Sequence, residues 1–177
     1  ATPFTAVLIR EKFKEKQIDI TNDLKIDITN DLKIVELNGK VSLDPFEIEY
    51  ITLTHSILEP NGLRIQTPVG SVLHTGDWKV DPDPLVGDKT NEKRLKEIGD
   101  EGVLAMICDS TNVMSAGKAG SELDVRKSML NIMSRLKKRI IITSFASNVA
   151  RMETAFYCAE QTGRQISLVG RSMHRIY

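Results

Sequence analysis

Apolar and polar residues alternate through most of residues 34–77, with the period of two that half-buried β-strands require. Turn residues at Asn38-Gly39 and at Pro68-Val69-Gly70 interrupt this alternation. The pattern predicts a run of antiparallel strands: IVEL at 34–37, VSL at 41–43, residues 46–53, LRIQT at 63–67 and SVLHTGD at 71–77.

Helical spacing appears on both sides of these strands. Apolar residues from Ala6 to Phe13 predict a first helix over about residues 4–16. The segment EKRLKEIG, residues 92–99, predicts a second, short helix that ends at Gly99.

The pattern changes after residue 102. Three continuous apolar segments predict buried strands, VLAMIC at 103–108, IIIT at 140–143 and ISLV at 166–169. Between them, a capping box from Ser121 to Asp124 opens one predicted helix, and a second one runs from Val149 to its end at Gly163. Alternating strands and helices of this kind predict an α/β fold with a parallel sheet covered on both faces.

An octapeptide, IDITNDLK, occurs twice in tandem at residues 18–25 and 26–33. Two such short copies are too few for a solenoid. We interpret residues 18–33 as a duplicated surface insertion that forms a strand and turn in each copy, or a hairpin between them. Deleting residues 26–33 is expected to change the melting temperature only slightly, because longer surface loops add little entropic cost.

The composition is that of a globular protein, with 41% hydrophobic and 27% charged residues. Basic and acidic residues number 24 each, so the net charge gives no general attraction to nucleic acid or anionic lipid.

Cys108 and Cys158 lie far apart in apolar segments, which favours buried thiols in a reducing cytoplasm. No segment resembles a signal peptide or a membrane span, and both ends of the chain resemble the interior of a domain.

Two residues at predicted strand ends have the chemistry of metal ligands. His55 follows the strand YITLT, and Asp77 follows Thr75-Gly76. Taken singly, an exposed histidine and a turn-forming aspartate are the more ordinary interpretations. Taken together, an imidazole and a carboxylate brought to one sheet edge suit zinc or manganese. His74 is interpreted as a structural or supporting residue.

The sequence contains five short motifs in a fixed order. They are THS at 54–56, HTGDWKVD at 74–81, CDSTN at 108–112, SFASNVAR at 144–151 and GRSM at 170–173. In this order they resemble the ribonuclease J group of the metallo-β-lactamase superfamily, whose members carry a β-CASP domain. The resemblance implies part of an αβ/βα sandwich over residues 1–112 and the beginning of a β-CASP domain over residues 113–177. It also implies that His55 is a metal ligand, that Asp77 bridges two zinc ions, and that Asp109 supports the catalytic centre. Such enzymes cleave RNA, and some remove nucleotides from its 5′ end.

The sequence also departs from this group. The ligand cluster H-x-H-x-D-H does not occur in it, and His174 lies in a different motif. We therefore expect a fragment that binds zinc weakly or not at all and is inactive alone, with the missing ligands on a complementary polypeptide. The alternatives are a non-catalytic RNA- or partner-binding remnant, or a β-CASP hydrolase that acts on DNA or another phosphoester.

The segment TSFASNVAR, residues 143–151, joins a predicted strand to a predicted helix. Hydroxyl side chains and backbone N–H groups at such a junction suit a phosphate group, which Arg151 would assist. The alternative is ordinary capping of the helix by Ser144 or Ser147.

Overall fold

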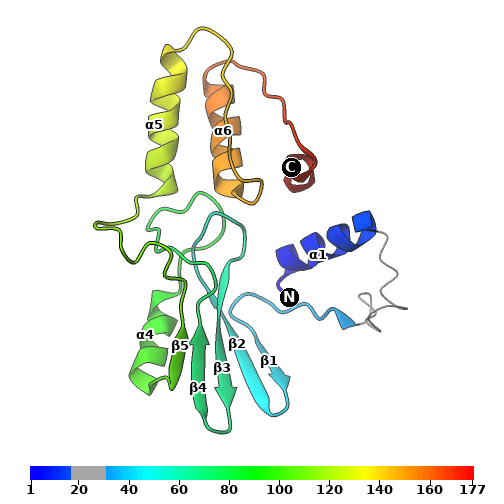
Figure 1. Ribbon diagram of the computed structural model, residues 1–177, viewed down its shortest axis with the longest axis vertical. Coiled ribbons are helices and arrows are strands. Elements are labelled where there is room, and N and C mark those ends of the chain that lie inside the picture. Colours follow the sequence, from blue (N-terminus) through cyan, green and yellow to red (C-terminus); the bar gives the residue numbers. More distant parts are fainter. Residues whose placement is uncertain (17–30) are drawn as a thin grey trace. The chain divides into compact units, whose positions relative to one another are not determined.

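The structure, a computed structural model, describes residues 1–16 and 31–177 (Figure 1). The chain divides into two compact units. Unit 1 comprises residues 1–52, 61–76 and 91–108, and unit 2 comprises residues 53–60, 77–90 and 109–177. These units do not test the predicted domain boundary at residue 112, which stays a prediction. The strand and hairpin predicted for the duplicated octapeptide fall mostly on residues 17–30, outside the described residues.

Unit 1 contains a mixed five-stranded sheet in the order β1-β2-β3-β4-β5 (Figure 1). The first four strands are antiparallel neighbours, and β5 pairs with β4 in the parallel direction. The antiparallel run and the α/β class predicted from the sequence are confirmed. The strands are β1 (Lys40–Leu43), β2 (Phe46–Thr52), β3 (Asn61–Thr67), β4 (Gly70–His74) and β5 (Ala105–Ile107).

The first predicted strand, IVEL at 34–37, is wrong because these residues pair with no strand in the described part of the chain. The Val35 N–H donates instead to the carbonyl of Ala1 at 2.9 Å. The turn after it is confirmed. The Gly39 N–H donates to the Glu36 carbonyl at 2.9 Å, and Asn38 adopts a left-handed φ of 57°, which asparagine tolerates better than most residues.

The strand register divides the sheet into a charged face and an apolar face, because successive side chains point to opposite sides. Glu49 lies opposite both Lys40 and Arg64, so these three residues share the charged face. The other face carries apolar side chains of all four antiparallel strands. They are Val41, Ile48, Leu63, Ile65 and Val72.

The charged face is joined to helix α4 (Glu92–Glu101) by ion pairs. Arg94 of α4 bonds Glu49 of β2, while Arg64 of β3 bonds Glu101 of α4 at 2.6 Å. Ile98 lies on the same side of α4 and is completely buried. The helix ends at Glu101 rather than at the predicted Gly99, and Gly102 closes it with a φ of 85°. The predicted N-terminal helix is confirmed as α1 (Pro3–Lys16).

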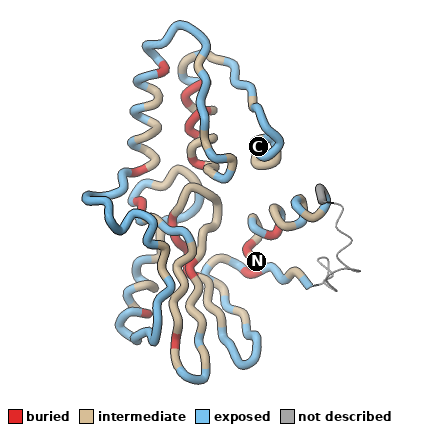
Figure 2. The backbone as a smooth tube through the Cα atoms, in the orientation of Figure 1, coloured by how far each residue is buried: buried red, intermediate tan, exposed pale blue. Residues whose placement is uncertain are grey.

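Unit 2 is built around two neighbouring helices, α5 (Glu122–Arg135) and α6 (Val149–Gln161), followed by the short helix α7 (Arg171–Ile176). The predicted cap of α5 is confirmed, since the Ser121 hydroxyl accepts from the Leu123 N–H at 3.1 Å. Figure 2 shows that buried positions recur along α6, where Ala150, Thr154 and Cys158 are buried. None of the helices in residues 1–16 and 31–177 is long and apolar enough to cross a lipid bilayer.

Of the three parallel strands predicted after residue 102, VLAMIC forms one in part, the short strand β5, whereas IIIT and ISLV form none in the described part of the chain. Residues 140–143 and 166–169 have no strand partner in the described part of the chain, and the exposed fractions of Ile141 and Val169 are 86% and 88%. VLAMIC shortens to β5, whose three residues are all exposed. An apolar segment becomes a buried strand only where neighbouring strands accept its backbone hydrogen bonds and side chains cover it.

Candidate functional site

His55 lies just beyond the end of β2, in the short segment 53–60 of unit 2. It follows Thr54, whose side chain is 2% exposed, and is itself half-buried. Its Nδ1 atom is 3.4 Å from the Ser56 hydroxyl. The imidazole is therefore attached to an anchored backbone while it retains access to solvent.

Asp77 lies on the neighbouring segment of unit 2 and is exposed. An isolated antiparallel bridge joins Thr54 to Lys79, and the Lys79 N–H donates to the Thr54 carbonyl at 2.8 Å. His55 follows one end of this bridge, and Asp77 precedes the other by two residues. The structure thus makes the two predicted ligand segments neighbours.

Asp109 is tied to the same segments. The Trp78 indole N–H donates to the Asp109 carbonyl oxygen at 3.1 Å. The Asp109 carboxylate accepts from the Thr111 hydroxyl and, at 3.0 Å, from the Thr111 N–H. These two hydrogen bonds, together with the nearby charge of His55, hold the pKa of Asp109 below its ordinary value. All three predicted site residues therefore lie in connected segments of unit 2.

The other two histidines have different surroundings. His74 ends β4 in unit 1, and its Nδ1 atom accepts from the Gly76 N–H at 3.0 Å, as suits a structural residue. His174 is exposed in the last turn of α7. The interpretation of His55 and Asp77 as metal ligands at one sheet edge stays a prediction.

Within residues 1–16 and 31–177, no three histidine, cysteine, aspartate or glutamate side chains are grouped so that they could hold a metal ion. His55 and Asp77 have suitable donor atoms, but a catalytic zinc usually has three protein ligands. The described residues thus fit zinc in ligand type and not in ligand number. Cys108 and Cys158, both described, are not joined by a disulfide.

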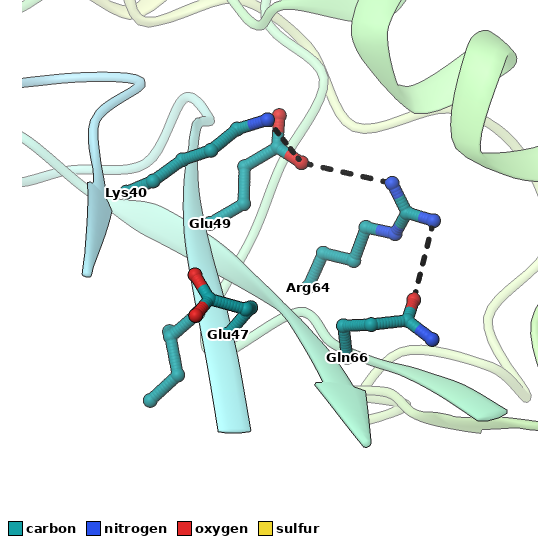
Figure 3. A pocket seen from close by; sticks show the side chains of 6 residues that line it. Lys40, Glu47, Glu49, Arg64 and Gln66 are labelled. Carbon is teal, nitrogen blue, oxygen red and sulfur yellow. Dashed lines mark hydrogen bonds and ion pairs between the residues drawn. The ribbon is translucent and has the colours of Figure 1, made fainter. Parts of the chain in front are cut away.

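A cavity of 240 Å³ lies on the charged face of the sheet in unit 1 (Figure 3). Glu49 is within 3.9 Å of Lys40 and 3.8 Å of Arg64, and Arg64 also reaches Gln66 at 3.5 Å. The ion pairs of Glu49 connect strands β1, β2 and β3. We interpret the cluster as structural.

The segment TSFASNVAR does not have the predicted geometry, because residues 140–143, which precede helix α6, form no strand. Neither Ser144 nor Ser147 caps that helix. Asn148 does so, accepting from the Arg151 N–H at 2.8 Å. The Arg151 guanidinium is engaged with Glu122 at 3.3 Å, so it is not held open for a phosphate group.

Asp81 is a buried residue of the same segment that the sequence analysis did not single out. Its carboxylate accepts from the Glu122 N–H at 2.9 Å and from the Asp83 N–H at 3.0 Å, and lies 3.5 Å from Lys79 Nζ. Burial would raise its pKa, but these hydrogen bonds, one from Ser121 and the charge of Lys79 lower it overall. The only sequence signal was its position, four residues after Asp77 in HTGDWKVD.

Residues 137–177 match the family model of the ribonuclease J β-CASP domain. The chain is 39% identical over 178 residues to ribonuclease J of Sinorhizobium meliloti, covering 99% of this chain and 30% of that protein. It is 40% identical over 177 residues to ribonuclease J of Corynebacterium glutamicum, covering 99% of this chain and 23% of that protein. The chain thus spans less than a third of the length of these relatives.

Among solved structures, the fold is similar to a protein of unknown function from Enterococcus faecalis V583, with a TM-score of 0.58 and 12% identity. The similarity covers 97% of this chain and 40% of that one, and it concerns the fold alone. The family match assigns residues 137–177 to a β-CASP segment. More particularly, the chain is a homologue of ribonuclease J, which confirms the resemblance drawn from its motifs.

Proposed function

We propose that the chain is part of a ribonuclease J-type RNA hydrolase, in which His55 and Asp77 are ligands of a two-zinc centre and Asp109 supports that centre. The observation that carries this proposal is the connection of the three segments within unit 2, in a chain homologous to ribonuclease J over almost its whole length. RNA is the substrate class implied by the names of the relatives. Cleavage from the 5′ end or within the chain, in the cytoplasm, is the activity proposed for the complete protein.

In that protein, a zinc pair would supply a hydroxide nucleophile and stabilise charge on the attacked phosphodiester. This chain would contribute the imidazole of His55 and the carboxylates of Asp77 and Asp109. The remaining ligands would come from a polypeptide that carries H-x-H-x-D-H, a motif absent from these 177 residues.

The purified chain is expected to hold zinc weakly and to leave RNA uncut, because its described residues provide too few ligands for a catalytic site. A structural site with all its ligands binds zinc with a favourable free energy on the order of 10 kcal/mol or more. Metal analysis after dialysis, together with a 5′-labelled RNA assay, measures both properties. Tightly held stoichiometric zinc with RNA cleavage by the chain alone would contradict the proposal.

Adding a polypeptide with H-x-H-x-D-H is expected to raise zinc affinity and to produce RNA cleavage. Asp77→Ala should abolish that cleavage. Asp88→Ala is the matched control, since Asp88 is also an exposed aspartate in residues 77–90 of unit 2. Equal activity of the two variants would remove Asp77 from the proposed site.

A further inference from the structure

The buried Thr54 side chain connects the segments that carry the site residues. Its hydroxyl donates to the Lys79 carbonyl, accepts from the Asp81 N–H at 3.0 Å, and lies 2.9 Å from the Thr90 hydroxyl. A threonine hydroxyl has one proton to donate and two lone pairs, so these three contacts use its full capacity. Its backbone is engaged as well, since the Thr54 N–H donates to the Thr90 hydroxyl at 3.0 Å.

All of these contacts lie within unit 2, and those with Lys79 and Asp81 hold the segment that follows Asp77. His55 follows Thr54 directly. Trp78 lies between Asp77 and Lys79, and its indole N–H is bonded to Asp109. The hydrogen bonds between Thr54 and Lys79 therefore restrict the movement of the segment that contains His55 and of the segment that contains Asp77.

We propose that Thr54 is a positioning residue, whose hydroxyl holds the segment from Asp77 to Asp81 against the segment of His55 so that Trp78 meets Asp109. Thr54 touches neither RNA nor metal in this proposal. Its catalytic part rests on the proposed function, whereas its structural part stands on the hydrogen bonds alone.

The single tryptophan of the chain, Trp78, gives one indole N–H signal in a nitrogen-15 NMR spectrum. Thr54→Val removes the hydroxyl and keeps the branched shape. We expect it to shift that signal and to speed its hydrogen exchange, and that of the Lys79 and Asp81 amides, by about tenfold or more. Thr54→Ser retains the hydroxyl and is expected to restore the wild-type signal and exchange rates.

Thr52→Val is the matched control. Thr52 is equally buried, at 2% exposure, and its hydroxyl has no hydrogen-bond partner among the described residues. Removing that hydroxyl is expected to leave the Trp78 signal unchanged. A Thr54→Val protein with the wild-type Trp78 signal and exchange rates would overturn the proposal.

The wild-type protein provides a test that does not depend on any variant. The Asp81 amide is expected to exchange as slowly as the amides within α5, and exchange at the rate of an unstructured chain would overturn the proposal.

In the mixture with the H-x-H-x-D-H polypeptide, Thr54→Val should lower kcat for RNA by about tenfold or more and leave KM nearly unchanged, with rescue by Thr54→Ser. An unchanged kcat in an active mixture would overturn the catalytic part of the proposal. Absence of cleavage by the wild-type mixture would instead count against the proposed function, and the NMR and exchange results would still decide the structural part.

Discussion

Glu49→Ala is expected to lower the free energy of unfolding by about 3 kcal/mol, because it breaks a largely buried ion-pair cluster from its centre. Arg94 donates to the two carboxylate oxygens of Glu49 at 2.7 and 2.9 Å, a bidentate arrangement. The Glu49 and Arg94 side chains are only 12% and 20% exposed. Without the carboxylate, Arg94 and Arg64 would share only Glu97 and Glu101, at the more exposed side of the cluster.

This contribution is expected to decrease in acid. The hydrogen bond from Arg94 and the charges of Arg94, Lys40 and Arg64 lower the pKa of Glu49 below 4.5, although burial opposes them. A lowered pKa in the folded state means that the stabilisation is fully present above the pKa of the unfolded chain. It is lost as pH falls below 4.5 and through the folded value.

Urea unfolding followed by circular dichroism measures the effect of Glu49→Ala. Glu47→Ala is the matched control, since Glu47 lies on the same strand and face as Glu49 but is exposed. We expect the control to change stability by no more than about 0.5 kcal/mol. Equal effects of the two variants would mean that the cluster contributes no more than surface charges do.

The sequence allowed the central strands to be predicted because local signals were sufficient there. Alternation and turn residues specify the hairpins of β2, β3 and β4, whose partners are close in the chain. The predicted strands IIIT and ISLV depended instead on distant neighbours. Apolar character alone does not provide the backbone partners that a parallel strand needs.

At the candidate site, too, local sequence signals supported predictions and contacts between distant residues did not. His55 and Asp77 were predicted from their residue types and their positions at strand ends, and Asp109 from the resemblance to the ribonuclease J group. The contacts around them were not visible there, because Asp81 meets Glu122 across 41 positions and Thr54 meets Thr90 across 36. Spacing within a motif gives no information about such pairs. Thr54 and Asp81 lie within the segments THS and HTGDWKVD, but their structural contacts could not be predicted from the sequence.

Asp81→Ala is expected to lower the free energy of unfolding by about 2–3 kcal/mol, because its carboxylate caps α5 from a distant segment. The Asp81 side chain is 4% exposed and accepts from the Glu122 N–H at the beginning of that helix. Removing it would leave the N–H groups of Glu122 and Asp83 without these acceptors and Lys79 without its nearest carboxylate. Asp81→Asn retains one acceptor oxygen and should lose about half as much stability.

Asp124→Asn provides the control, since Asp124 is also in the first turn of α5 but its side chain is 70% exposed. It should change stability by no more than about 0.5 kcal/mol. The pKa of Asp81 is lowered on folding, so the difference between wild type and Asp81→Asn should be largest above 3.8 and should shrink as pH falls below it. Urea unfolding at neutral pH and at successively lower pH measures this difference. A gap that stays constant or widens in acid would show that the charge of Asp81 does not stabilise the fold, and that its contribution comes from shape and neutral hydrogen bonding alone.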